Sequence, residues 1–115
     1  MTSGIQIRRY LTESGKGVFG EWLSVLKDAR TQAKIVVRID RPAVGNFGDC
    51  KPLGGGLFEL RIDSGPGYRI YYAMIGRTCV LLLCGGDKKR QTSDIRRTRE
   101  YLKDYWERSR ETKND

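Results

Sequence analysis

Histidine is absent from the 115 residues of this sequence, and cysteine is scarce. The missing histidine excludes the common zinc sites and the nucleophiles that a histidine base activates. Cys50, Cys79 and Cys84 show no metal-ligand spacing, and three thiols cannot all pair within one chain. We therefore interpret them as small buried side chains, and we expect neither a metal nor another cofactor.

Long apolar runs are missing as well. No apolar stretch approaches the ~20 residues that span a bilayer. The N-terminus, MTSGIQIRRYLT, lacks the apolar segment and the small-residue cleavage site of a signal peptide. We therefore expect a cytoplasmic protein with no membrane partner. Its length suits a single domain over residues 1–115, with a core at about 5–106 and a polar tail at 107–115.

The charge is strongly unbalanced. Lys and Arg outnumber Asp and Glu by 22 to 14, which gives a formal net charge of +8 and a sequence pI near 9.7. This balance favours an acidic partner, either a nucleic acid or an acidic protein. The cations are most concentrated at the C-terminal end, where a solvated helix face is the simpler interpretation.

Apolar periodicity predicts the N-terminal half of the fold. A short strand falls within residues 5–11. An amphipathic helix follows, because Phe19, Trp22, Leu23 and Leu26 recur at positions i, i+3, i+4 and i+7. A second helix runs through residues 33–39 and ends before Pro42, since the residue before a proline avoids helical geometry. The glycine-rich residues 45–56 are expected to form a connector without a phosphate-binding loop motif.

Period-two patterns predict the C-terminal half. Strands are expected at residues 57–63, 68–75 and 78–84, joined by turns that contain glycine. The last of these includes CVLLLC, which is apolar on both faces and should lie inside the sheet. A final helix begins near Thr92 or Ser93, either of which can cap it. We therefore predict an α+β fold: an N-terminal strand and two helices, a twisted and mainly antiparallel sheet of three further strands, and a C-terminal helix.

Charged and aromatic side chains are predicted on one face of the first two of these three strands. If the strands pair in simple register, Glu59, Arg61, Arg69 and Tyr71 share a face. A guanidinium group matches two phosphate oxygens and stays charged, so two arginines on one sheet face suit a phosphate. A cluster of cations, Lys88 to Arg90, follows the third strand. We interpret this region as an RNA-facing surface.

The order of the motifs resembles a known family. GNFGD and KPL are followed by FELR, GPGYRIYY, LLLCGGDK and a Gln-x-x-Asp-Ile helix start. This set is similar to the RelE/ParE toxin superfamily, and within it to the phage Gp49-like or HigB-like addiction module killer proteins, over roughly residues 5–106. The resemblance implies a compact RelE-like fold. It also implies a toxin of a type II toxin–antitoxin system, restrained by an antitoxin such as a helix-turn-helix HigA-like protein.

The resemblance leaves the target open. RelE-type members cleave mRNA in the A site of the 70S ribosome, whereas ParE-type members poison DNA gyrase. The first alternative predicts an endoribonuclease, or mRNA interferase, that uses the RNA 2′-hydroxyl as nucleophile without a metal. The others are a non-catalytic ParE-like gyrase inhibitor and a degenerate RNA-binding domain.

The RelE alternative assigns roles by matching motifs. Arg69 matches the arginine of the family's GYR-like motif and Arg61 that of its ELR motif, and both would stabilise the phosphorane. Lys88 and Lys89 would exchange protons, and Tyr71 would stack a base or donate to phosphate. Glu59 is either a general base or a salt-bridge partner. The candidate catalytic residues are thus Arg69, Arg61, Lys88, Lys89, Tyr71 and Glu59, and further RNA contacts are expected at Lys51, Arg90, Arg96 and Arg97.

The sequence departs from the family pattern at positions that supply protons. Leu57 and Glu59 replace the RelE-type lysines on the strand before the GYR motif. The RelE-type tyrosine of the C-terminal helix falls near Asp94 or Ile95, and the histidines of some HigB-type nucleases are absent. The general acid and base therefore stay open.

Overall fold

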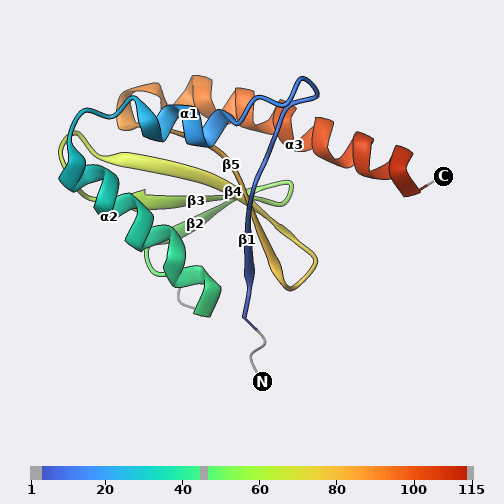
Figure 1. The fold of residues 1–115 in the computed structure, drawn as a ribbon, viewed down its shortest axis with the longest axis horizontal. Coiled ribbons are helices and arrows are strands. Elements are labelled where there is room, and N and C mark those ends of the chain that lie inside the picture. The colour runs from blue at the N-terminus through green and yellow to red at the C-terminus, as the bar shows by residue number, and fades with distance from the viewer. Residues whose placement is uncertain (1–3, 45–46, 114–115) are drawn as a thin grey trace.

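The computed structural model describes residues 4–44 and 47–113. Figure 1 shows the course of the chain. In chain order the elements are β1 (Gln6–Arg9), α1 (Val18–Ser24), α2 (Ala29–Asp40), a 3-10 turn (Arg41–Val44), β2 (Cys50–Gly54), β3 (Leu57–Ile62), β4 (Tyr68–Ile75), β5 (Cys79–Asp87), a second 3-10 turn (Lys88–Arg90) and α3 (Gln91–Lys113). The predicted α+β class with a C-terminal helix is confirmed.

One five-stranded sheet organises the molecule. The strand order is β1-β5-β4-β3-β2, in which β1 runs parallel to β5 and all other neighbours are antiparallel. Strand β5, which carries the CVLLLC run, lies between β1 and β4 and is buried over almost its whole length, as expected from its two apolar faces. None of the helices in the described part of the chain has the length and hydropathy of a bilayer span.

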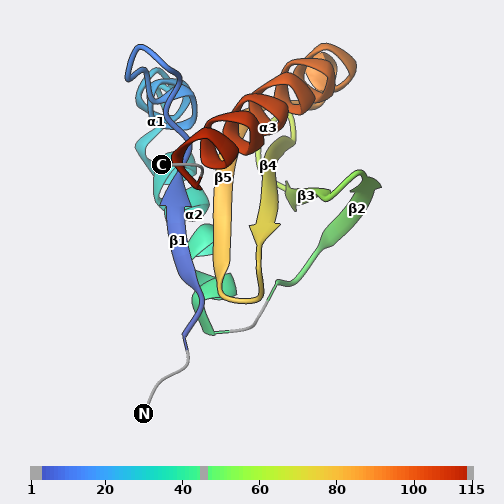
Figure 2. The same ribbon diagram turned by 90° about the vertical axis from the view of Figure 1, so that its right-hand side faces the viewer.

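Each face of the sheet has its own core. Phe19 of α1 and Ile35 and Ile39 of α2 pack against one face. Helix α3 covers the other face, where Leu102 packs against a cluster centred on Tyr71 and Leu83. Figure 2 shows the sheet between α2 and α3 in this layered arrangement.

Local chemistry explains where α2 begins. Asp28 caps the helix, because its carboxylate accepts hydrogen bonds from the Arg30 amide at 3.0 Å and the Thr31 hydroxyl at 2.8 Å. The Gln32 side chain donates to the carbonyls of Leu23 and Leu26 at 3.0 and 2.7 Å, which ties α2 to the end of α1. Helix α2 ends at Asp40, close to the predicted stop before Pro42.

The sequence prediction missed one strand. The glycine-rich segment interpreted as a connector contains β2, so four strands rather than three follow α2. Its first two residues, 45 and 46, lie outside the described residues. Gly54, Gly55 and Gly56 have φ values of 91°, 66° and 85° and form the tight turn from β2 to β3. The strand was hidden because it is a mostly exposed edge strand that contains proline and lacks apolar alternation.

Helix α3 is longer than predicted. It continues to Lys113, through most of the segment expected to be a polar tail. Arg108 bonds to Asp104 one turn earlier at 2.7 Å and donates to the carbonyl of Leu11. The C-terminal half of α3 is thereby fixed to the chain that follows β1.

Candidate nucleic-acid interface

The predicted pairing of the two arginine-bearing strands is confirmed. Arg61 lies directly opposite Arg69, and Glu59 lies directly opposite Tyr71. Directly paired residues project from the same face of a sheet. The four side chains therefore share one face of the sheet. Tyr71 packs with Leu102 of α3, so this is the face on which α3 lies.

Glu59 holds the two arginines together. Its side chain is fully buried, and Oε1 accepts a hydrogen bond from Arg61 Nε at 3.1 Å and lies 3.7 Å from Arg69 Nε. The other oxygen, Oε2, accepts from Gln91 Nε2 at 2.7 Å, in the first turn of α3. A buried carboxylate needs such partners to remain charged. The structure thus shows the salt-bridge alternative for Glu59, and the carboxylate is closed to a substrate hydroxyl in this arrangement.

The two arginines differ in their access to solvent. The side chain of Arg69 is 12% exposed, and that of Arg61 is 37% exposed. Arg69 also donates from Nη1 to the carbonyl of Tyr68 at 3.2 Å, which fixes its direction. Arg69 is therefore a preoriented and partly desolvated cation, whereas Arg61 extends further into solvent.

Arg61, Arg69 and Lys88 line one surface hollow of about 260 Å³. Its wall is the turn from β3 to β4, Gly65 to Gly67. Lys88 is brought there by a backbone hydrogen bond from its amide to the carbonyl of Gly67, at 3.0 Å. Asp49 and Asp63 line the same hollow. Three of the cations predicted to bind phosphate thus meet at one place, although they are dispersed in sequence.

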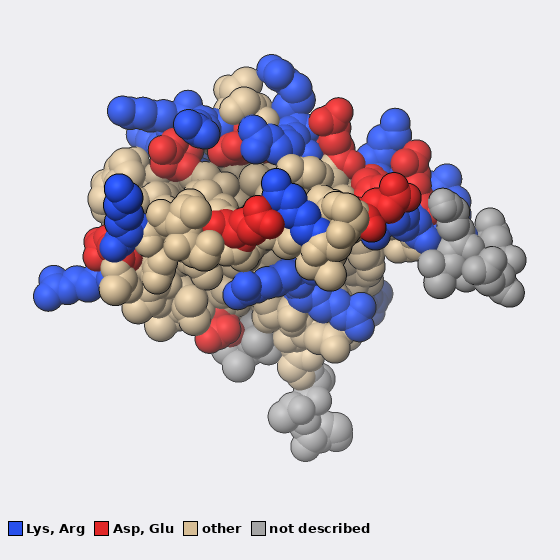
Figure 3. Space-filling view, turned by 45° about the horizontal axis from the view of Figure 1, so that its top comes forward, with Lys and Arg blue, Asp and Glu red and all other residues tan. Residues whose placement is uncertain are grey.

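Other candidate residues lie elsewhere. Lys89 and Arg90 are exposed on the turn before α3, and Lys51 is exposed on β2 in register with Glu59. Arg96 and Arg97 are exposed on α3. Figure 3 shows Lys and Arg intermixed with Asp and Glu on the face that carries α3. None of these five residues lines the hollow that contains Arg69.

Tyr71 corrects the expectation of a stacking platform. Its ring is fully buried in the core under α3, so it cannot stack on a base in this conformation. Burial, reinforced by the nearby carboxylates of Glu59 and Asp94, raises the pKa of the Tyr71 phenol. The sequence showed which face Tyr71 occupies but not that a helix covers it.

The buried hydroxyl of Tyr71 gives a direct test of its role. In the described part of the chain this hydroxyl has no hydrogen-bond partner. We expect Tyr71→Phe to raise the free energy of unfolding by about 1 kcal/mol, because an unsatisfied polar group leaves the core. Urea unfolding measures this change as a higher midpoint with an unchanged slope. A lower midpoint would contradict the interpretation of this hydroxyl as an unsatisfied buried group.

Asp94 is a second buried polar residue that sequence reasoning did not single out as a site. It lies in the first turn of α3, and its Oδ2 has no hydrogen-bond partner among the described residues. Oδ2 packs so closely on β5 that a Cβ added to Gly86 would lie 1.9 Å from it. Burial raises the pKa of Asp94, opposed by the positive charges of Arg97 and Arg90.

The raised pKa of Asp94 predicts a pH-dependent stability. The folded state holds the proton more tightly than the unfolded state, so this group's contribution is present below the ordinary pKa of 3.8 and is lost as the pH rises through the folded pKa. At pH 7 we expect Asp94→Asn to be more stable than wild type by about 1 kcal/mol. The difference should vanish near pH 3 in urea titrations. Glu100→Gln, an exposed change on the same helix, is the control and should show no such trend.

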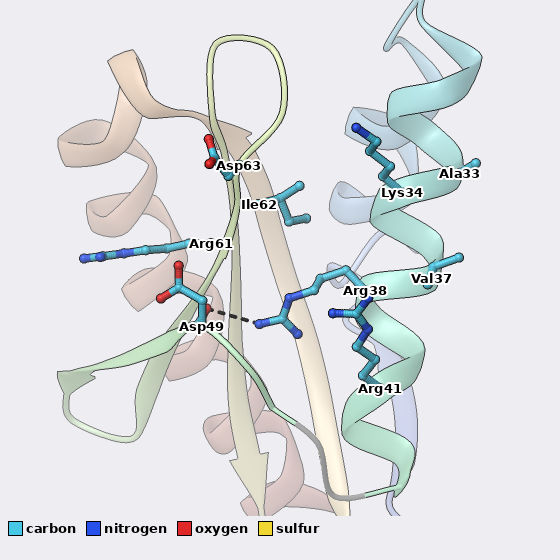
Figure 4. A pocket seen from close by; sticks show the side chains of 9 residues that line it. All are labelled: Ala33, Lys34, Val37, Arg38, Arg41, Asp49, Arg61, Ile62 and Asp63. Carbon is cyan, nitrogen blue, oxygen red and sulfur yellow. Dashed lines mark hydrogen bonds between the residues drawn. The ribbon is translucent and has the colours of Figure 1, made fainter.

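A second hollow lies between α2 and β3, with a volume of about 540 Å³ (Figure 4). Lys34, Arg38 and Arg41 line it from the helix side. Sequence reasoning missed these residues because it assigned the helix from its apolar residues and gave its charged residues no role. A signal was present: Arg38 falls three residues after Ile35 and one before Ile39, on the buried stripe, where a charged residue calls for an explanation.

Two comparisons with known proteins give matches over most of the chain. A family model described as "Phage derived protein Gp49-like" matches residues 21–103. A protein of Haemophilus influenzae described as uncharacterized is 50% identical over 95 residues, which are 83% of this chain and 90% of that protein. The matched range runs from α1 to α3 and contains both hollows.

Proposed function

Because the chain belongs to the phage-derived Gp49-like family, a family of addiction module killer and RelE-like toxins, we propose that it arrests growth by cutting mRNA on the ribosome. The family implies an antitoxin partner that restrains this toxicity. The observation that carries the proposal is the convergence of Arg61, Arg69 and Lys88 on one hollow. This cluster suits a phosphodiester better than it suits a neutral or cationic ligand.

The proposed reaction is metal-independent transesterification. The 2′-oxygen of one ribose bonds to the neighbouring phosphorus while the bond from phosphorus to the 5′-oxygen breaks. The products are a 2′,3′-cyclic phosphate and a new 5′-hydroxyl. Negative charge develops on the phosphorane oxygens, and guanidinium groups placed there in advance lower the barrier. Glu59 acts behind them as a positioning residue, because it touches the arginines and not the substrate.

Proton transfer is assigned to the groups that line the hollow. The leaving 5′-oxygen needs a proton, and Lys88 is the residue there with a transferable one. The proton of the 2′-hydroxyl needs an acceptor, and the carboxylates in the hollow are those of Asp49 and Asp63. Tyr71 takes no part, because its ring is buried.

A ParE-like action on DNA gyrase is the second candidate. It is favoured by the burial of Glu59 and Tyr71, which removes two expected catalytic groups from the surface. A toxin that only binds a protein needs no general acid or base. On this alternative the Arg69 hollow would contact an acidic segment of the target.

Induced expression without antitoxin separates the two. We expect growth arrest with new mRNA 5′-hydroxyl ends at ribosomal A-site codons and cyclic phosphates on the upstream fragments. Chromosomal DNA should stay intact. Double-strand DNA breaks with intact mRNA would instead select the gyrase alternative. Co-expression of the antitoxin should restore growth in either case. The chemistry of the RNA ends therefore distinguishes mRNA cleavage from action on gyrase.

A further inference from the structure

The hollow between α2 and β3 is lined by more cationic residues than carboxylates. Figure 4 shows Lys34 and Arg38 reaching from α2 toward the sheet, and Ile62 pointing back toward the helix. Arg41 lines the same hollow at the end of α2. Arg61 leaves β3 on the side away from α2 (Figure 4). The hollow therefore lies on the opposite side of the sheet edge from the guanidinium of Arg61.

Arg38 is the centre of this excess. The residue is only 7% exposed, and its Nη2 donates to the backbone carbonyls of Phe47 and Asp49. Both partners are neutral, and Nη1 is buried without a hydrogen-bond partner among the described residues. Within residues 4–44 and 47–113, no carboxylate lies within ion-pair distance of Arg38, Lys34 or Arg41. A buried cation without an ionic partner is costly, and an anion would reduce that cost.

Repulsion between like charges further disfavours the charged form of Arg38. Burial lowers the pKa of the Arg38 guanidinium, and the neighbouring charge of Arg41 lowers it further. The opposing influence of Asp49 is smaller than either. An anion bound between Arg38 and Arg41 would relieve both the desolvation and the repulsion. Because guanidinium groups bind phosphate with two parallel hydrogen bonds, a phosphate fits this pair.

The two hollows adjoin at the edge of the sheet. Asp49, Arg61, Ile62 and Asp63 line both of them. Together they are lined by six cationic side chains and two carboxylates. A ligand that fills both has to turn around the sheet edge. Duplex nucleic acid is too stiff for such a turn, since its persistence length is about 150 base pairs, whereas a single strand bends freely.

We propose that Lys34, Arg38 and Arg41 form a second phosphate subsite, which binds a neighbouring phosphate of the same single RNA strand whose scissile phosphate lies at Arg61, Arg69 and Lys88. This inference rests on the proposed function. It adds a binding requirement: a substrate must offer at least two phosphates, and its strand must be unpaired where it crosses the sheet edge. Arg38 is a positioning element as well, because it also holds the backbone before β2.

Removing the two exposed cations tests the subsite. Lys34→Ala/Arg41→Ala leaves Arg38 and its backbone contacts in place. With a fluorescent RNA hexanucleotide made uncleavable by 2′-O-methyl groups, we expect the Kd to rise about tenfold. The slope of log K against log salt should fall by about 0.7 for each phosphate that the variant no longer neutralises. For a mononucleotide 3′-phosphate, titrated calorimetrically, the Kd should stay within about twofold of wild type, because the Arg69 hollow alone holds one phosphate.

The matched control removes the same charge elsewhere. Lys27 and Arg77 are exposed and line neither hollow, so Lys27→Ala/Arg77→Ala should change the hexanucleotide Kd by less than about threefold. Equal losses in the two double variants would overturn the subsite, as would an equal loss on the mononucleotide. Unchanged RNA binding with weakened antitoxin binding would also overturn it and assign the hollow to an acidic protein segment.

Measuring mRNA cleavage in a translation extract tests the proposed reaction independently of the phosphate subsite. If wild type cuts mRNA and the Lys34→Ala/Arg41→Ala variant binds the hexanucleotide normally, the subsite fails and the proposed function stands. If wild type cuts no mRNA but the length-dependent loss of binding is observed, the proposed reaction fails and the phosphate subsite stands.

Discussion

Replacing Arg69 by alanine should abolish toxicity while the protein still folds. Arg69 is the most enclosed cation of its hollow, and Glu59 and the Tyr68 carbonyl fix its direction. Loss of one such preoriented donor typically lowers the rate of the chemical step by about 10²- to 10³-fold. Growth after induction and the yield of mRNA ends in a translation extract measure the effect.

Controls distinguish a defect in chemistry from a defect in structure. In the variant, Glu59 keeps its hydrogen bonds from Arg61 and Gln91, so the buried carboxylate still has partners. We expect the urea midpoint to fall only slightly. Arg69→Lys keeps the charge but loses the planar fork, and it should recover part of the cleavage. Arg77→Ala, on the exposed turn after β4, should remain fully toxic. A fully toxic Arg69→Ala protein would refute the phosphate-binding role.

Much of this site follows from the sequence, because period-two alternation fixes which side chains share a sheet face. The bounds of β4 and the placement of Arg61 and Arg69 on one face of the sheet were predicted correctly. Alternation cannot show what covers a face. The burial of Glu59 and Tyr71 depends on the docking of α3, which is a contact between segments far apart in the chain.

A bulge in β5 is a second feature that alternation misses. The register shifts between Tyr71 opposite Cys84 and Tyr72 opposite Leu82, so Leu83 is an extra residue in the strand. Leu83 and the adjacent Cys84 consequently pack in the same core, although neighbours in a regular strand face opposite ways. The bulge places Gly86 opposite Arg69 and so helps to align the loop that carries Lys88. Nothing in the CVLLLC run marks its position.

The phosphate subsite was missed for a related reason. An apolar pattern reports which segments form helices, and it predicted a second helix through residues 33–39. It does not report that the chain before β2 passes close enough for Arg38 to donate to two of its carbonyls. When a backbone segment far away in the sequence buries a charge, the sequence gives only an indirect sign of it. Here that sign is a cation on the apolar stripe of a helix.

The largest expected loss of stability comes from Gly85→Ala in β5. A Cβ at this position would lie 2.3 Å from Trp22 Cε3, 2.5 Å from Cζ3 and 2.7 Å from Cδ2. The indole cannot easily withdraw, because it packs against the rings of Phe19 and Tyr68, with centroid distances of 5.8 and 6.0 Å. Overpacking of this kind costs about 3 kcal/mol. Urea unfolding should show the loss as a lower midpoint with an unchanged slope.

A double-mutant cycle identifies the cause. Trp22→Ala removes the obstructing ring, so adding Gly85→Ala to it should cost less than about 1 kcal/mol, which is a coupling of about 2 kcal/mol. Gly20→Ala in α1 is the matched control, since its Cβ would meet only the flexible end of Arg9 at 3.1 Å. An alanine inside a helix is favoured over glycine, so this variant should be neutral or slightly more stable. Additive costs at positions 22 and 85 would mean that α1 does not dock on β5 through Trp22. Contacts other than the packing of Trp22 would then have to hold the end of β5 in place, next to the hollow that Lys88 lines.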